Sequence, residues 1–326
     1  MQLKAARFID PLSDFGFKHL FGNEPNKDVL IDFLNQLFKG QKEITDLTYS
    51  PTEHNGDKKE FKKVFFDLLC TGINGEQFII EMQRAEQRNF GDRAVFYTSR
   101  LINEQLPKGK SHWNIELKEV YLIAILEFNF KYNASDRYLH NVSLTNTDTG
   151  EIFYNKLGYK FLELPNFVKT ETELQTDLDR WFYLLKNMSH LDKIPTVFNK
   201  RIFQKVFKIA EVSNLTKEEK AMYDSNLKAK WDYENALAYA KEIAEEEGLK
   251  KGMEKGMEKG LKVGWREALL ACIASLLRAH FGEDGLKVLP AIQAIQEQDR
   301  LLAIHTAIAT AATLDEARHS WENCHD

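Results

Sequence analysis

Residues 64–70 (VFFDLLC) and 77–83 (QFIIEMQ) are two short runs rich in aromatic and β-branched side chains, and TGINGE connects them at 71–76. Such runs around an Asn-Gly pair predict a β-hairpin. Each run carries one carboxylate among apolar neighbours, Asp67 in the first and Glu81 in the second. Because a carboxylate in a buried strand is costly unless it is paired or binds a cation, the hairpin marks a candidate functional site.

The length of the loop between the two strands determines whether the two carboxylates meet. If the Asn-Gly pair at 74–75 forms a two-residue turn, Asp67 faces Met82, and Glu81 lies on the other face of the sheet. If the loop is residues 73–75, with its glycine in the left-handed conformation making a bulge, Asp67 faces Glu81 with Cβ atoms ~5 Å apart. We predict the three-residue loop.

Two carboxylates on neighbouring strands repel each other unless a positive charge compensates them. Carboxylates together with main-chain oxygens suit Mg²⁺ or Mn²⁺. Asp67 and Glu81 are therefore candidate metal ligands, and Gln83 lies on the same strand face as Glu81. In the alternative interpretation the two carboxylates are buried ion-pair or hydrogen-bond partners of Lys62, Lys63 or Arg93.

Helices and strands alternate up to about residue 170, which indicates an α/β fold class. A run at 119–128 is apolar on both faces, as a central strand covered by helices would be. We expect shorter strands at 151–154 and 160–164, and helices at 14–21, 25–38 and 89–106.

The chain after residue 171 has helical signals only. Thr216 and Glu219 form a predicted capping box at the start of a long helix. That helix continues into GLKKGMEKGMEKGLKVG, where glycine recurs every four residues from Gly248 to Gly264. The glycines either permit close helix–helix approach or mark a solvated linker. Further helices are expected at 268–281, 286–296 and 299–312.

Composition excludes several classes of protein. The 326 residues carry a formal net charge of −5 and 43% hydrophobic residues, which excludes global disorder and a simple polycationic nucleic-acid coat. The sequence contains no apolar run of ~18 residues and no signal-peptide pattern. Three widely separated cysteines form no zinc or disulfide pattern. We therefore expect a cytoplasmic protein with no membrane partner.

The opening motif DPLSDFGFKHLFG (10–22), together with FFDLLC, FIIEMQR and a following helix that carries Arg93 and Tyr97, resembles the recombination-promoting nuclease/transposase family. This family belongs to the PD-(D/E)XK nuclease superfamily, and the resemblance covers about residues 7–170. It implies a restriction-endonuclease-like core, a mixed sheet flanked by helices, with an all-α C-terminal extension. We expect a nuclease core at 1–170, a helical extension at 171–240, a glycine-repeat helix or linker at 241–264 and a small helical module at 265–326.

The resemblance implies a Mg²⁺- or Mn²⁺-dependent DNA endonuclease of low sequence specificity that promotes recombination or serves mobile elements or defence. Asp67 and Glu81 would hold the metal, and the Met82 carbonyl would complete the site. Gln83 stands where the superfamily normally has lysine; it can orient a water but supplies no positive charge. Candidate sources of that charge are Lys18, Lys62 and Lys63.

Arg93, Tyr97 and Arg100 are spaced i, i+4 and i+7 and so share one helix face. With Gln87 at the helix entrance they are predicted to contact DNA phosphates; the alternative is a packed aromatic ring beside solvated arginines. Asp14 and Lys18 are also four residues apart. They either approach the metal or form a surface ion pair.

Two other functions remain open at this point. Without the superfamily lysine, the fold could persist as a catalytically weak or inactive DNA- or protein-binding module. Alternatively, the C-terminal helices could be a platform for a protein partner that directs the nuclease. We also expect a homodimer, with the glycine-repeat helix as one candidate interface.

Overall fold

The computed structural model describes residues 6–54, 64–86, 89–106, 115–129 and 137–322. The chain divides into two compact units, Met1–Asp232 and Tyr233–Asp326. The first unit carries the sheet and the candidate site. The second unit consists of helices in the part that is described.

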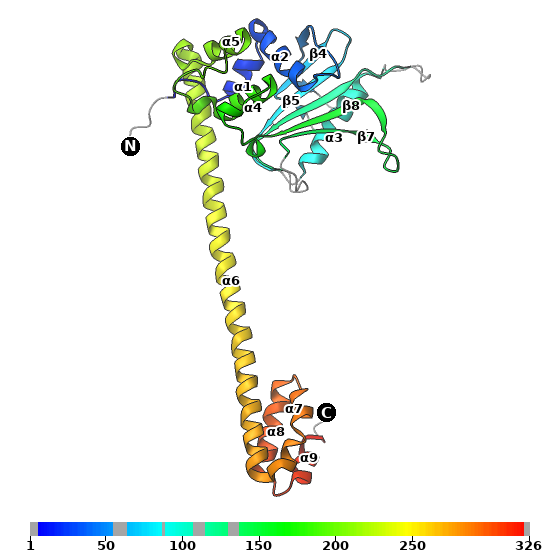
Figure 1. Ribbon diagram of the computed structural model, residues 1–326, viewed down its shortest axis with the longest axis vertical. Coiled ribbons are helices and arrows are strands. Elements are labelled where there is room, and N and C mark those ends of the chain that lie inside the picture. Colours follow the sequence, from blue (N-terminus) through cyan, green and yellow to red (C-terminus); the bar gives the residue numbers. More distant parts are fainter. Residues whose placement is uncertain (1–5, 55–63, 87–88, 107–114, 130–136, 323–326) are drawn as a thin grey trace. The chain divides into compact units, whose positions relative to one another are not determined.

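A mixed six-stranded sheet forms the centre of the first unit, in the order β1-β4-β5-β6-β8-β7 (Figure 1). β5 pairs in parallel with β6 and β6 with β8, whereas β1 and β7 add antiparallel edges. A separate two-stranded sheet joins β2 and β3. The strands are β1 Leu47–Tyr49, β2 Glu53–His54, β3 Val64–Phe65, β4 Leu68–Gly72, β5 Gln77–Gln83, β6 Val120–Leu126, β7 Leu139–Thr145 and β8 Ile152–Glu163.

Helices cover both faces of the sheet, which explains why β6 is apolar on both sides (Figure 1). One face packs against α1, α2, α4 and α5 through a large aromatic core that includes Phe33, Trp181 and Phe203. The opposite face packs against α3. The bounds are α1 Asp14–Phe21, α2 Lys27–Leu37, α3 Phe90–Glu104, α4 Asp177–Asn187 and α5 Arg201–Ala210, with 3-10 turns at Glu24–Asn26, Leu164–Asn166, Glu171–Glu173, Met188–His190 and Val212–Asn214.

The hairpin adopts the predicted register. Leu68 lies opposite Ile80 and Cys70 opposite Phe78. The loop is residues 73–75, closed by the Gly72 N–H that donates to the Glu76 carbonyl at 2.8 Å. Gly75 has φ +87°, a left-handed conformation that glycine adopts without the Cβ penalty. The three-residue loop is therefore confirmed.

Several strands differ from the prediction. The expected strand 64–70 is interrupted at residues 66–67, between β3 and β4. The two short strands expected at 151–154 and 160–164 are one strand, β8. Gly158, inside β8, is no turn residue: a Cβ there would lie 3.0 Å from Tyr121 Cδ1, so glycine lets the tyrosine ring lie against the strand. The edge strands β1 and β7 were not predicted from the sequence.

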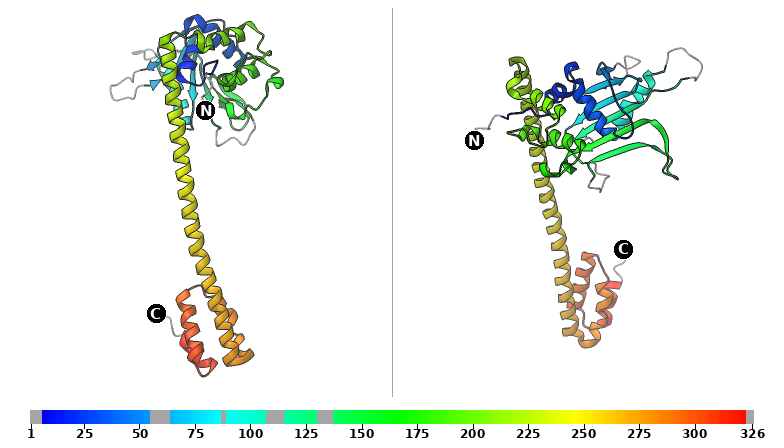
Figure 2. Two further views of the ribbon diagram at one scale, coloured as in Figure 1. Left: turned by 90° about the vertical axis from the view of Figure 1, so that its left-hand side faces the viewer. Right: turned by 45° about the horizontal axis from the view of Figure 1, so that its top comes forward.

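The second unit is built on the later part of α6 Lys217–Leu286, whose first residues belong to the first unit. The predicted capping box is present, since the Glu219 N–H donates to Thr216 Oγ1 and the Thr216 N–H to Glu219 Oε2. Gly282, with φ 60° and ψ −147°, interrupts the helical geometry. The later part of α6 lies beside the last helices, which are drawn in orange and red in Figure 2. These helices are α7 Leu289–Gln293, α8 Gln298–Thr310 and α9 Leu314–Glu322, and they share a hydrophobic core with Ile273 and Leu277.

The glycine repeat is helical and open to solvent. A Cβ added at any glycine from Gly248 to Gly264 would meet no atom within 4 Å beyond the adjacent backbone of its own helix. The neighbouring apolar side chains Leu249, Met253, Met257, Leu261 and Trp265 are also exposed. Within the described ranges, no helix combines the length and apolar character that crossing a membrane requires.

Candidate active site

Asp67 and Glu81 lie together at the point where β4 leaves β5. The Asp67 N–H donates to Glu81 Oε1 at 3.2 Å, and the Met82 N–H donates to Asp67 Oδ2 at 2.8 Å. The regular ladder stops one residue earlier, at Leu68 opposite Ile80. At this position side-chain carboxylates, rather than main-chain carbonyls, accept the main-chain N–H groups, and the regular pairing of the two strands ends.

The main chain of Met82 faces the same gap. Its N–H points to Asp67, and in a strand the N–H and C=O of one residue point to the same neighbouring strand. The Met82 carbonyl therefore faces the Asp67 side as well. Two carboxylates and one carbonyl form a set of oxygen donors of the kind that hard divalent cations take.

Burial makes this pair of carboxylates electrostatically costly. Glu81 is only 3% exposed. Burial first, and then the nearby Asp67 charge, raises the pKa of Glu81 from its usual 4.5 to about 8. Burial likewise raises the pKa of Asp67, although its hydrogen bond from Met82 and the charge of Lys18 oppose that shift. A cation between the two groups would relieve both shifts.

Gln83 supplies a hydrogen bond rather than a charge. It is 8% exposed, and its Nε2 donates to Glu81 Oε2 at 3.2 Å. Positive charge comes from outside β5. Arg93 on α3 lowers the pKa of both carboxyl groups, and Lys18 on α1 lowers that of Asp67. The structure therefore brings Arg93 and Lys18 to the carboxylates.

A pocket of about 430 Å³ opens beside Asp67 and is lined by Asp14, Lys18, His19 and Glu219 among others. Asp14 and Lys18 form an ion pair at 2.8 Å, with both side chains about half exposed. The surface ion pair of the structural alternative is thus present, and both residues also line the pocket beside Asp67.

The face of α3 is only partly available. The Arg93 guanidinium donates to the Tyr97 hydroxyl at 2.9 Å, and the Tyr97 ring packs edge-on against Phe66. Arg100 pairs with Glu104 at 3.0 Å. Tyr97 and Arg100 therefore have structural contacts of their own. Arg93 bonds to Tyr97 and also lowers the pKa of both carboxyl groups. Gln87, Lys62 and Lys63 lie outside the described residues.

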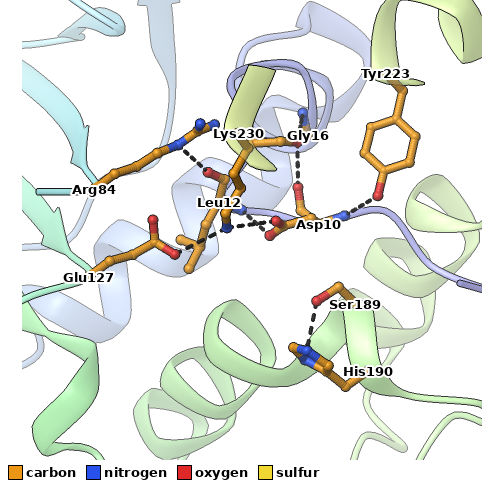
Figure 3. A network of polar contacts seen from close by, with 10 residues as sticks. Asp10, Leu12, Gly16, Arg84, Glu127, Ser189, His190, Tyr223 and Lys230 are labelled. Carbon is orange, nitrogen blue, oxygen red and sulfur yellow. Dashed lines mark hydrogen bonds and ion pairs between the residues drawn. The ribbon is translucent and has the colours of Figure 1, made fainter. Parts of the chain in front are cut away.

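An ion-pair network beside the site was missed from the sequence (Figure 3). Lys230, at the beginning of α6, contacts Asp10 Oδ2 at 2.9 Å and Glu127 Oε1 at 3.2 Å. The Glu127 N–H donates to the Gln83 carbonyl at 3.0 Å. This Lys230 clasp, which we define as Asp10, Glu127 and Lys230, joins the opening motif to the end of β5. Asp10 belongs to the quoted opening motif, but no spacing signal points to Lys230 or Glu127.

Arg84 and Tyr223 extend the network around the opening motif (Figure 3). Arg84 Nε donates to the Leu12 carbonyl at 3.3 Å, and the Asp10 N–H donates to the Tyr223 hydroxyl at 2.8 Å. Ser13 accepts the Gly16 N–H as the N-cap of α1. The motif thus holds α1, the end of β5 and the beginning of α6 in one arrangement.

The candidate metal site has few protein ligands, and these are of the type that a divalent cation prefers. Among the described residues, no group of three or more His, Cys, Asp or Glu side chains is placed to hold a metal. The fit rests on two buried carboxylates with raised pKa values and a main-chain oxygen. Such a set leaves much of the coordination sphere to water and substrate, as is usual for Mg²⁺.

A mixed six-stranded sheet flanked by helices, followed by a long C-terminal helix, is a PD-(D/E)XK-like α/β fold with a helical extension. The chain belongs to the PD-(D/E)XK nuclease family transposases, whose family profile matches residues 11–240. The family and fold class predicted from the sequence are thereby confirmed. Comparisons with curated proteins and with solved structures gave no match.

Proposed function

We propose that this chain is a metal-dependent DNA endonuclease that hydrolyses phosphodiester bonds with Mg²⁺ or Mn²⁺. The observation that supports this function is the buried Asp67–Glu81 pair at the gap between β4 and β5. Family membership supports a nuclease in general. The metal, the reaction and the roles of the residues are our proposal.

In this mechanism Asp67, Glu81 and the Met82 carbonyl would hold the metal. When bound there, Mg²⁺ or Mn²⁺ would lower the pKa of a water and neutralise charge on the phosphodiester. Gln83 holds Glu81 in place and orients the water by hydrogen bonding. Arg93 and Lys18 supply the positive charge that Gln83 lacks, since both act on the carboxylates from neighbouring helices.

DNA would approach over α3, with Arg93, Tyr97, Arg100 and Gln87 as its proposed contacts. Contacts of this kind to phosphates position the duplex but carry no sequence information. We therefore propose low sequence specificity. Cleavage would promote recombination of mobile DNA or defend the cell. DNA as substrate and the free thiols of Cys70 and Cys272 fit a cytoplasmic location.

A plasmid-nicking assay with Mg²⁺ or Mn²⁺ tests the proposal. We expect Asp67→Ala and Glu81→Ala each to lower the rate by at least about 100-fold, because each removes a metal ligand. Glu76→Gln is the matched control, since Glu76 is a buried carboxylate at the loop end of the same hairpin. Wild-type activity in either alanine variant would contradict the proposed site.

The second candidate function is a catalytically inactive DNA- or protein-binding module. The observation that favours it is that Gln83 donates to Glu81 where the superfamily normally has a lysine. In this case the protein would retain DNA on a filter but would cleave none with any divalent metal. The wild-type protein distinguishes the two functions, because only a nuclease would cleave the DNA that it retains.

We also propose a homodimer formed through α6, with the two copies antiparallel. Residues 234–247 hold five Glu and one Lys, a net charge of −4, whereas residues 250–263 hold five Lys and two Glu, a net charge of +3. Antiparallel pairing places each acidic segment on a basic one, whereas parallel pairing places like charges together. The exposed apolar row from Leu249 to Trp265 would be buried in the contact. The C-terminal helices remain a candidate surface for another protein partner.

A further inference from the structure

A second pocket of about 340 Å³ lies on the α2 side of the sheet and shares no residue with the candidate active site. Its walls come from the loop after α2, from the beginning of β6, and from β7 and β8. Its lining includes Lys42, Tyr121, Asn141, Ile152, Gly158 and Lys160. Glu81 pairs with Ala124, further along β6 than Tyr121. The pocket therefore lies towards the other end of β6.

Lys160 is a buried cation without an acidic partner in the described part of the chain. It is 4% exposed, and its Nζ donates to Asn141 Oδ1 at 2.7 Å and to Gln41 Oε1 at 3.2 Å. Both acceptors are neutral amides. The Nζ also lies 4.3 Å from the centre of the Phe38 ring. Burial lowers the pKa of Lys160 to about 8, because the charged form is desolvated and no carboxylate among the described residues stabilises it.

The other lysine of the pocket is already compensated. Lys42 forms an ion pair with Glu119 and lies 4.7 Å from the centre of the Tyr121 ring. Glu76 also raises the pKa of Lys42, against the effect of burial. The excess positive charge of the pocket is therefore that of Lys160.

The remaining walls suit an aromatic or apolar group. Gly158 allows the Tyr121 ring to lie against β8, because a Cβ there would be 3.0 Å from Cδ1 of the ring. Val142 and Ile152 line the pocket and are exposed at 45% and 61%. A volume of this size exceeds a bare anion and matches a small-molecule site.

We propose that this pocket binds a phosphomonoester that carries an aromatic base, with Lys160 and the amide of Asn141 on the phosphate and Tyr121 beside the base. The same chemistry is found in a free nucleoside monophosphate and at a 5′-phosphorylated end of a DNA strand. The site is separate from the proposed endonuclease site and does not depend on it.

Calorimetric titration of the full chain without divalent metal tests the proposal. The probes are dAMP, inorganic phosphate, and a short single-stranded oligonucleotide with and without a 5′-phosphate. We expect dAMP to bind at least tenfold more tightly than inorganic phosphate. Tighter binding of the phosphorylated oligonucleotide than of its unphosphorylated form would identify a strand end as the source, and binding of dAMP alone would identify a free nucleotide. Equal affinity for dAMP and phosphate would overturn the assignment of an aromatic ligand.

Substitutions at Lys160 and Asn141 test whether dAMP binds in this pocket. Lys160→Met is expected to weaken dAMP binding at least tenfold, while the unliganded protein melts at the same or a higher temperature because a buried charge is removed. Lys156→Met is the control, since Lys156 lies on the same strand and pairs with Glu116 outside the pocket. Asn141→Asp is an independent test, because an aspartate beside Lys160 would replace the anion and weaken dAMP binding. Unchanged dAMP binding in both pocket variants would show that dAMP binds outside this pocket, adventitiously, and would overturn the proposal.

Discussion

Asp67 and Glu81 are joined through each other's main chain: Glu81 accepts the N–H of Asp67, and Asp67 accepts the N–H of the residue after Glu81. Each carboxylate thus accepts a hydrogen bond from the main chain of the segment that carries the other. These two hydrogen bonds position both carboxylates without a ligand, as a preorganised site requires. The arrangement also concentrates negative charge in a buried gap, which raises the pKa of both carboxyl groups.

The first prediction concerns pH and stability without metal. The pKa of Glu81 is raised to about 8, so the fold favours its neutral form. That contribution to stability is full below about pH 4.5 and is lost as the pH rises through about 8. We expect Glu81→Gln to raise the free energy of unfolding at pH 8 by about 1–3 kcal/mol. Urea unfolding with a chelator present measures this; a variant no more stable than wild type at pH 8 would contradict it.

The second prediction concerns metal binding. Because Glu81 must lose its proton to act as a ligand, Mg²⁺ or Mn²⁺ binding should release protons and tighten as the pH rises from 6 to 8. Calorimetry in two buffers of different ionisation enthalpy measures the released proton. Glu81→Gln should abolish the release. A pH-independent affinity in the wild type would show that the metal binds elsewhere.

The third prediction concerns Arg93. This side chain lowers the pKa of both carboxyl groups, so Arg93→Met should raise the pKa of Glu81 further and slow nicking by about 10- to 100-fold. The pH at which the rate is half-maximal should move upward, which lost packing would not cause. Arg201→Met, an exposed arginine on α5, serves as the control. Equal rates and equal pH profiles for the two variants would exclude an electrostatic role for Arg93.

The fourth prediction concerns the Lys230 clasp. Lys230 is largely buried between Asp10 and Glu127, so Lys230→Met leaves two carboxylates without their cation and should cost about 3 kcal/mol of stability. Adding Glu127→Gln should recover part of that loss. Thermal unfolding of the three proteins tests this, and a double variant less stable than Lys230→Met would contradict it.

The fifth prediction concerns α6. Replacing Gly252, Gly256 and Gly260 by alanine adds methyl groups that, within one chain, meet no atom within 4 Å beyond the adjacent backbone of the helix. In a monomer the change should stabilise the helix by about 1 kcal/mol per residue. In the proposed dimer the added methyl groups should weaken association at least tenfold, as sedimentation measures. An unchanged association constant would remove the glycine face from the interface.

The hairpin shows why much of the candidate site was predictable. The alternation of side chains is a property of the strand itself, and Gly75 determined which of two registers applies. The predicted helices 14–21, 25–38 and 89–106 correspond to α1, α2 and α3, because their apolar spacing is local.

The Lys230 clasp shows where sequence reasoning stops. Lys230 meets Asp10 across 220 positions of the chain, and no local pattern encodes that contact. The same holds for Arg93, whose helix spacing predicts a shared face but not that the face turns towards Asp67. β8 was predicted as two strands, since no local pattern shows that Gly158 lies inside one strand, where it makes room for the Tyr121 ring of another strand.

The three-residue loop of the hairpin has a consequence for how this site varies among sequences. Removing a single residue between Gly72 and Glu76 shifts the pairing by one position, which turns Glu81 to the opposite face of the sheet. No side chain of the site changes identity in such a deletion. The chemistry would nevertheless be lost, so the number of residues in this loop is as much a determinant of the site as the carboxylates themselves.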